Sequence, residues 1–172
     1  TWGKLREPML RFVQWARTFG VTSSDGRWLL YSQEPSLGQS PLRSPSVFNF
    51  FRPGYVPAGT ALATTGQPAP EFQITNENTV ATYINFMRDR IAYGYTSDNS
   101  KLAANYAREL ALVADPAALV ARLSLLLTGN QLSAASVSTI RDAVTTIGAD
   151  SEAGRNNRVW AAILLVMCSP DY

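Results

Sequence analysis

The sequence predicts an all-α fold, an irregular helical bundle of about six helices with a long ordered loop rich in proline and aromatic residues. Two observations support this prediction. In several segments apolar residues recur every three or four positions, which is the period of a helix buried on one side. Most of the ten prolines lie instead between residues 35 and 70, where neither a long helix nor a central strand can form. We find no convincing strand pattern and no internal repeat.

The first predicted helix spans residues 4–19. Pro8 is tolerated only in the first turn of a helix, so the regular part is expected to begin near Arg6 or Glu7. Gly20 is a natural stop, because glycine readily adopts the left-handed conformation found just past a helix end. The apolar side chains at helical spacing are Leu5, Met9, Phe12, Val13, Ala16 and Phe19.

Residues 21–72 are predicted to form an ordered loop that packs on the helices. Solvated linkers lack large aromatic side chains. This segment, in contrast, contains Trp28, Tyr31, Phe48, Phe50, Phe51, Tyr55 and Phe72. One short helix is expected inside the loop, with Ser44 as its N-cap, residues 45–51 as its body and an end at Pro53.

Two more helices are predicted between residues 75 and 114. Thr75 or Asn76 caps the first, which runs to about Tyr93 and ends at Gly94. Residues 97–100 form a polar turn. The second helix is expected over residues 101–114, where the apolar positions are Leu102, Tyr106, Leu110 and Val113.

Three helices complete the predicted bundle. Asp115 and the proline after it are typical of a helix start, and this helix is expected to run to about Thr128. Ser133 caps the next helix, which ends before Gly148. The last helix, over about residues 156–167, is apolar nearly all round, which predicts that it is buried.

The composition excludes several classes of function. The 15 basic and 13 acidic residues leave a formal charge of only +2, too small for a nucleic-acid-binding surface. The absence of histidine removes catalytic triads and the usual zinc sites. The longest apolar runs fall well short of the roughly 18 residues that span a bilayer. We therefore expect no metal, no cofactor, no nucleic-acid partner and no membrane span.

Polar and aromatic residues are densest in two stretches, residues 48–55 and 70–77. Aromatic faces beside arginine and amide groups suit sugars, planar ligands or a protein partner. The same residues also suit a loop that anchors itself, with Arg52 paired to Glu71 or Glu77. Both interpretations stay open here. The candidate binding residues are Asn49, Arg52, Tyr55, Glu71, Asn76 and Glu77.

The sequence assigns no catalytic residue. A glycosidase needs two carboxyl groups that face one cleft, and sequence alone cannot show which carboxylates meet. Glu71 and Glu77 are the acid–base candidates for a hydrolase that acts on a polysaccharide or another polymer.

Four stretches of the chain resemble motifs of a known protein family: residues 3–8, 44–55, 70–77 and 169–172. Their sequences are Gly-Lys-Leu-Arg-Glu-Pro, Ser-Pro-Ser-Val-Phe-Asn-Phe-Phe-Arg-Pro-Gly-Tyr, Pro-Glu-Phe-Gln-Ile-Thr-Asn-Glu and Ser-Pro-Asp-Tyr. Together they resemble the C-terminal portion of a bacterial family known as domain of unknown function 1800. The resemblance implies a longer, largely helical and exported protein, periplasmic or extracellular, without an agreed activity.

We accordingly expect residues 1–172 to be a single helical domain, or the C-terminal part of a larger one. A structural or interaction role is the main hypothesis, with no enzymatic activity for this chain alone. The partners would be the missing N-terminal portion of the same protein and another exported protein. Part of a hydrolase is one alternative, and a glycan or cell-surface binding module is the other.

Overall fold

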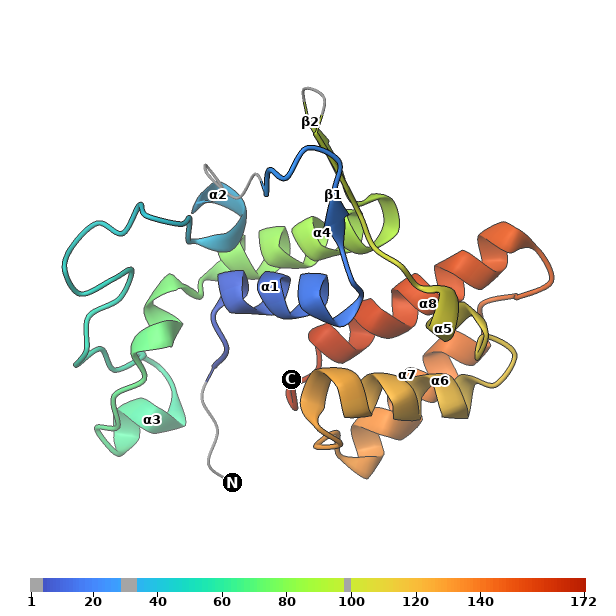
Figure 1. Ribbon diagram of the computed structural model, residues 1–172. Helices are drawn as coiled ribbons and strands as arrows, with labels where there is room; N and C mark the ends of the chain where they lie inside the picture. Colours follow the sequence, from blue (N-terminus) through green and yellow to red (C-terminus); the bar gives the residue numbers. More distant parts are fainter. Residues whose placement is uncertain (1–4, 29–33, 98–99) are drawn as a thin grey trace. The chain divides into compact units, whose positions relative to one another are not determined.

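The computed structural model describes residues 5–28, 34–97 and 100–172 (Figure 1). The chain is mostly helical, which confirms the predicted all-α class. It divides into two compact units: unit 1 is Thr1–Phe12 with Leu29–Phe86, and unit 2 is Val13–Trp28 with Met87–Tyr172. Each unit is described by itself below. The expectation of a single helical domain stays a prediction.

Unit 1 is built from short elements around the ends of two longer helices. It holds the start of α1 (Pro8–Thr18), α2 (Glu34–Leu37), α3 (Ala61–Thr64), the 3-10 helix η1 (Pro70–Ile74) and most of α4 (Glu77–Tyr93). The helices expected near residues 4–19 and 76–93 are thus confirmed. The one-turn helices α2 and α3 were not expected, because four residues are too few to show a helical period.

A small apolar core holds unit 1 together. The rings of Phe12 and Phe86 lie 5.8 Å apart, and Leu37 of α2 is fully buried. The Thr82 hydroxyl of α4 donates a hydrogen bond to the Ser36 carbonyl at 2.9 Å, which fixes α2 against α4.

Residues 45–51 form turns, so the short helix predicted there is wrong. The Ser46 hydroxyl accepts a hydrogen bond from the Phe48 backbone N–H at 3.1 Å, and the Asn49 N–H donates to the Ser46 carbonyl at 3.2 Å. Such local serine bonds offer the backbone an alternative to the helix. Asn49 then takes a left-handed conformation, with φ of 66°, which an α-helix cannot continue.

Unit 2 contains a small antiparallel sheet that the sequence did not predict. Its strands are β1 (Thr22–Ser23), β2 (Tyr95–Ser97) and β3 (Ser100–Ala103), in the order β1-β3-β2. The helix predicted over residues 101–114 is therefore wrong. Of residues 101–110, only those of the single turn α5 (Ala107–Leu110) are helical.

Gly94 explains why the chain turns into a strand after α4. Its φ of 65° ends the helix in a left-handed conformation. A Cβ atom at this position would collide with the backbone carbonyl of Leu102, so only glycine permits the close approach of β3. Leu102 itself is 3% exposed, and burial alternates along β3 as a half-buried strand requires.

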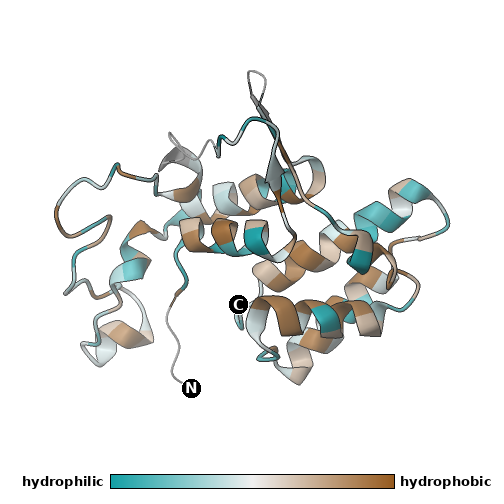
Figure 2. Ribbon diagram, in the orientation of Figure 1, coloured by the Kyte–Doolittle hydropathy of each residue, from teal (hydrophilic) through white to brown (hydrophobic). Residues whose placement is uncertain are grey.

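The largest part of unit 2 is a bundle of helices in mutual contact. It comprises α6 (Pro116–Leu123) with its π-helical continuation η2 (Ser124–Thr128), α7 (Ala134–Thr145) and α8 (Glu152–Met167). All three helices predicted for this region are confirmed. Figure 2 shows hydrophobic residues along these helices. The fully buried aliphatic side chains include Leu119, Val120, Leu123, Val144, Val159, Ile163 and Val166.

Side-chain caps fix where the bundle helices begin. Asp115 accepts a hydrogen bond from the Ala118 N–H at 3.0 Å, as the sequence suggested. Ser151 accepts one from the Gly154 N–H at 3.0 Å. Because Ser151 supplies this cap, α8 begins four residues earlier than the predicted start at residue 156.

Buried polar groups of the bundle find partners inside it. The Arg122 Nε lies 2.7 Å from the Glu109 Oε1, and the Glu109 side chain is 3% exposed. Arg158 of α8 donates hydrogen bonds to the carbonyls of Ile147 and Val113, which ties two interhelical loops to one guanidinium. These charged side chains thus satisfy groups that burial would otherwise leave unpaired.

Candidate functional site

Three of the candidate binding residues lie in the long connection between α2 and α3 of unit 1. Asn49 is exposed and closes the turn at Ser46. The Arg52 side chain is also exposed, while its backbone N–H donates to the Gln73 Oε1 at 2.7 Å. Tyr55 is half-buried, and its carbonyl accepts a hydrogen bond from the Ala69 N–H at 2.8 Å. These bonds hold the connection against the segment around η1.

Within the described part of the chain, the Arg52 guanidinium has no ion-pair partner. The expected pairing of Arg52 with Glu71 or Glu77 is therefore wrong. The backbone of Arg52, rather than its charge, does the anchoring. Its side chain is left to face solvent.

The other three candidates surround the start of α4. Glu71 lies in η1 and is only 4% exposed. Asn76 caps α4: its Oδ1 accepts from the Thr79 N–H at 3.0 Å, and its own N–H donates to the Thr79 hydroxyl at 2.9 Å. Glu77 is exposed in the first turn of α4, where its negative charge interacts favourably with the positive end of the helix dipole. The acid–base roles of the two glutamates stay a prediction.

A group of exposed apolar residues overlaps the stretch 48–55; the sequence analysis included Phe48 in that stretch but did not single out Leu42 or Val47. Residues 41–49, here called the 41–49 loop, are all exposed. Leu42, Val47 and Phe48 retain relative exposures of 104%, 95% and 57%. The sequence signal was the presence of large apolar side chains without any helical or strand period.

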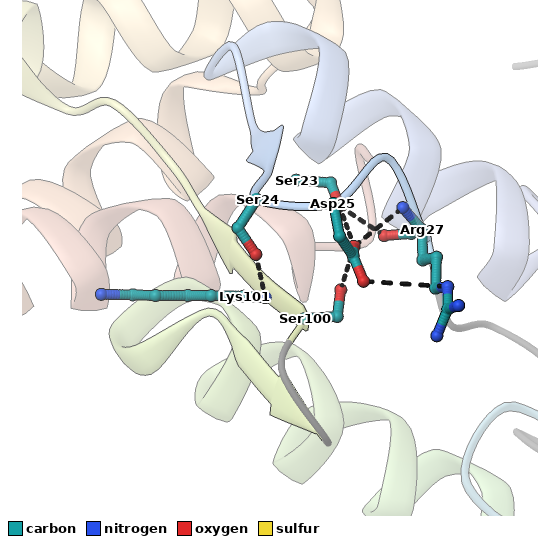
Figure 3. Close-up of polar contacts among 6 residues, drawn as sticks. All are labelled: Ser23, Ser24, Asp25, Arg27, Ser100 and Lys101. Atoms are coloured by element: carbon teal, nitrogen blue, oxygen red, sulfur yellow. Dashed lines mark hydrogen bonds and ion pairs between the residues drawn. The ribbon is translucent and has the colours of Figure 1, made fainter.

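Unit 2 contains a separate polar cluster around Asp25 (Figure 3). The Asp25 Oδ1 accepts hydrogen bonds from the Ser100 hydroxyl at 2.8 Å, the Arg27 N–H at 3.0 Å and the Ser23 hydroxyl at 3.1 Å. The Lys101 N–H donates to the Ser24 hydroxyl at 2.9 Å. In the figure Asp25 points toward β3.

The electrostatics of this cluster favour a structural role. The bond from Ser100, with those from Arg27 and Ser23, lowers the pKa of Asp25 below its ordinary value. A carboxylate with a lowered pKa holds a proton poorly and is a weak general base. Asp25 is therefore suited to pin the segment after β1 onto β3 rather than to activate Ser100.

A second carboxylate of unit 2 is held in the same manner near the end of the chain. The Asp171 Oδ2 accepts hydrogen bonds from the Ser136 hydroxyl at 2.5 Å, the Ser133 N–H at 3.0 Å and the Ser133 hydroxyl at 3.1 Å. The Ser136 and Ser133 bonds lower the pKa of Asp171. This carboxylate joins the last residues to the N-terminus of α7, where negative charge is stabilising.

The described residues contain no group of three or more cysteine, aspartate or glutamate side chains that could hold a metal ion. A separate search of the same residues found no helix with both the length and the apolar character needed to cross a membrane.

Comparison with known proteins gave a single finding. A family model with the description "Protein of unknown function (DUF1800)" matches residues 1–172. No curated protein matches the chain, and no solved structure matches it. The family match confirms the resemblance seen in the four sequence stretches.

Proposed function

Since the chain belongs to DUF1800, a family of proteins of unknown function, we propose a role from its own surface: a helical interaction module that docks another protein segment through the 41–49 loop. The partner in this proposal is the N-terminal portion of a longer exported bacterial protein. A second exported protein is the alternative partner. The exposure of the apolar side chains in the 41–49 loop is the observation that carries the proposal.

The apolar side chains of the loop are concentrated rather than scattered. Leu42, Val47 and Phe48 lie within seven consecutive positions and all face solvent. Isolated exposed hydrophobic residues are normal, whereas a local concentration is typical of a binding surface. Burying one such side chain gives roughly 1.5–3 kcal/mol, so a partner that covers all three gains substantial free energy.

The loop is also shaped before it binds. The Arg43 N–H donates to the Ser40 carbonyl at 3.3 Å, and the Ser46 turn follows. Leu42 itself has a φ of 59°, a left-handed conformation that costs a branched residue about 1–2 kcal/mol. A side chain that is both fully exposed and held in a strained backbone conformation indicates a functional constraint. A preorganised loop loses less conformational entropy when a partner covers it.

Charge points to the character of the partner surface. No acidic residue occurs between Pro35 and Pro70, while Arg43 and Arg52 both lie in or beside the loop. The exposed Arg52 guanidinium is available to a carboxylate on a partner, and complementary charge steers and orients association. We therefore expect the partner to present apolar groups bordered by acidic ones.

Native mass spectrometry of the protein isolated from its own source tests this proposal. Because an N-terminal portion of the same polypeptide stays covalently attached, the protein is first cut between the two portions by limited proteolysis. We expect the wild-type mass still to include the N-terminal fragment, and a Val47→Ser, Phe48→Ser double variant to lose it. Circular dichroism should show the fold unchanged, because both side chains are exposed. Leu125→Ser is the matched control. Leu125 lies in unit 2, outside the loop, and its exposed fraction of 56% is close to the 57% of Phe48. A double variant that retains the partner would refute the proposal.

A further inference from the structure

Unit 2 presents an exposed aromatic ring at the end of α4. Tyr93 is the last residue of this helix and is 75% exposed. Its ring lies 6.0 Å from the ring of Trp160 on α8, at an interplanar angle of 61°. This edge-to-face contact orients the tyrosine ring without covering it.

The backbone around Tyr93 is also held in place. Gly94 follows Tyr93 with φ of 65° and turns the chain into β2. Arg90, one turn before Tyr93, donates to the Gly94 carbonyl at 3.3 Å and lies 4.2 Å from the centroid of the Tyr95 ring. The backbone of Tyr93 is therefore held between a helix end and a strand, so this backbone loses little freedom on binding.

A polar side chain lies on the same helix as Trp160. Asn156 is one turn before Trp160 on the same face of α8, and helical side chains lean toward the N-terminus of their helix, so the indole lies over that turn. The Asn156 carboxamide makes no hydrogen bond with any residue that the structure describes. The Trp160 member of the aromatic pair thus shares its helix face with an amide that offers both a donor and an acceptor.

We propose that Tyr93, Trp160 and Asn156 form a binding platform for a pyranose ring of a polysaccharide. A pyranose has an apolar C–H face, which stacks on an aromatic ring, and a rim of hydroxyl groups, which bond to amides. Ligand sites combine aromatic surface with a few placed polar groups in this way. A protein-docking surface would instead gather several large apolar side chains, as the 41–49 loop does.

This platform is independent of the proposed docking loop. The loop belongs to unit 1, whereas Tyr93 and Trp160 belong to unit 2. Sugar binding and partner association can therefore be lost separately by substitution.

Saturation-transfer-difference NMR on the full 172-residue chain tests the platform. The probes are soluble hexasaccharides of β-1,4-linked glucose, β-1,4-linked N-acetylglucosamine and α-1,4-linked glucose. We expect transfer to the C–H protons of at least one of these sugars, with a dissociation constant near or below about 1 mM. Tyr93→Ala should weaken that binding about tenfold, because the loss of a stacked ring removes about 1.4 kcal/mol, the free energy of a tenfold change.

Matched variants separate stacking from general damage. Tyr93→Phe keeps the ring and should retain binding, whereas Asn156→Ala should weaken it without changing the far-ultraviolet circular dichroism. Phe48→Ala removes an exposed aromatic ring from unit 1 and should leave sugar binding unchanged. The proposal is overturned if none of the three sugars shows transfer at about 10 mM, or if Tyr93→Ala binds like the wild type.

Discussion

The α6–α8 bundle of unit 2 and the 41–49 loop of unit 1 both contain leucine, valine and other large apolar residues, yet their burial is opposite. Leu119 of α6 is 0% exposed, whereas Leu42 of the loop is 104% exposed. The difference lies in the pattern. A helical period places apolar side chains on one face that neighbouring helices cover. Irregular spacing in the loop forms no such face, and Leu42, Val47 and Phe48 stay exposed.

Charged groups follow the same division. In the bundle Arg122 reaches Glu109 and Arg158 reaches two backbone carbonyls. Beside the loop, the guanidinium of Arg52 faces solvent. These two arginines are thus paired within unit 2, whereas the loop segment has both apolar surface and positive charge exposed. Stability is therefore expected to depend on the bundle and association on the loop.

The largest expected difference is in the stability of two variants, Arg122→Ala and Arg52→Ala. Arg122→Ala should destabilise the protein by about 3–5 kcal/mol, because it leaves the buried Glu109 carboxylate without its partner. Arg52→Ala should change stability by no more than about 0.5 kcal/mol, as is usual for an exposed residue. Urea unfolding measures both. Similar losses in the two variants would contradict the division between the regions.

The second comparison uses the same substitution in both regions. Leu119→Ala should cost about 2–5 kcal/mol, from lost burial and the cavity that remains. Leu42→Ala removes a side chain that touches little and should stay within about 0.5 kcal/mol in the isolated chain. A destabilisation by Leu42→Ala of more than about 1 kcal/mol would show that the loop supports the fold.

A third comparison concerns helix caps. Ser151→Ala should lower global stability by about 1 kcal/mol, because the Gly154 N–H loses its acceptor at the start of the buried helix α8. Thr60 caps α3 in the same way through the Ala63 N–H, but α3 buries no residue. Thr60→Ala should therefore increase hydrogen exchange locally and leave the unfolding midpoint unchanged. Equal shifts of the midpoint would be evidence against this account.

The smallest effect is a dependence of bundle stability on pH. Hydrogen bonds from Ser136 and Ser133 lower the pKa of Asp171 from its ordinary 3.8 in the folded state. A lowered folded pKa means that the carboxylate stabilises the bundle fully above 3.8, and that this contribution is lost as the pH falls through the folded value. NMR titration should show the pKa of Asp171 rising toward 3.8 in Ser136→Ala. An unchanged titration would rule out the Ser136 bond as a cause of the lowered pKa.

Local signals in the sequence explain which parts of the fold could be predicted. Asp115 and Ser133 cap helices within three residues of themselves, so their roles are visible in a short window. The sheet was missed because β1 pairs with β3 across about eighty residues, and the two strands are only two and four residues long. The helix expected at residues 45–51 failed because Ser46 bonds its own neighbours.

The candidate site was predicted only in part, because only its local interactions can be read from a short window of sequence. The sequence predicted Thr75 or Asn76 as the cap of α4, because capping is local, and the structure shows that Asn76 is the cap. The solvent exposure of Leu42 and Phe48 depends on which elements fold back over them, and no sequence period reports that. The pairing expected for Arg52 assumed a three-dimensional neighbour that sequence spacing could not supply.

Hydroxyl-radical footprinting of the isolated chain and of the protein from its own source tests the docking role of the 41–49 loop most directly. We expect Leu42, Val47 and Phe48 to be oxidised readily in the isolated chain and protected in the native protein. Leu125, exposed to the same degree as Phe48 but located in unit 2, should react equally in both samples. Equal oxidation of Phe48 in the two samples would show that no partner covers the loop and would contradict the proposed function.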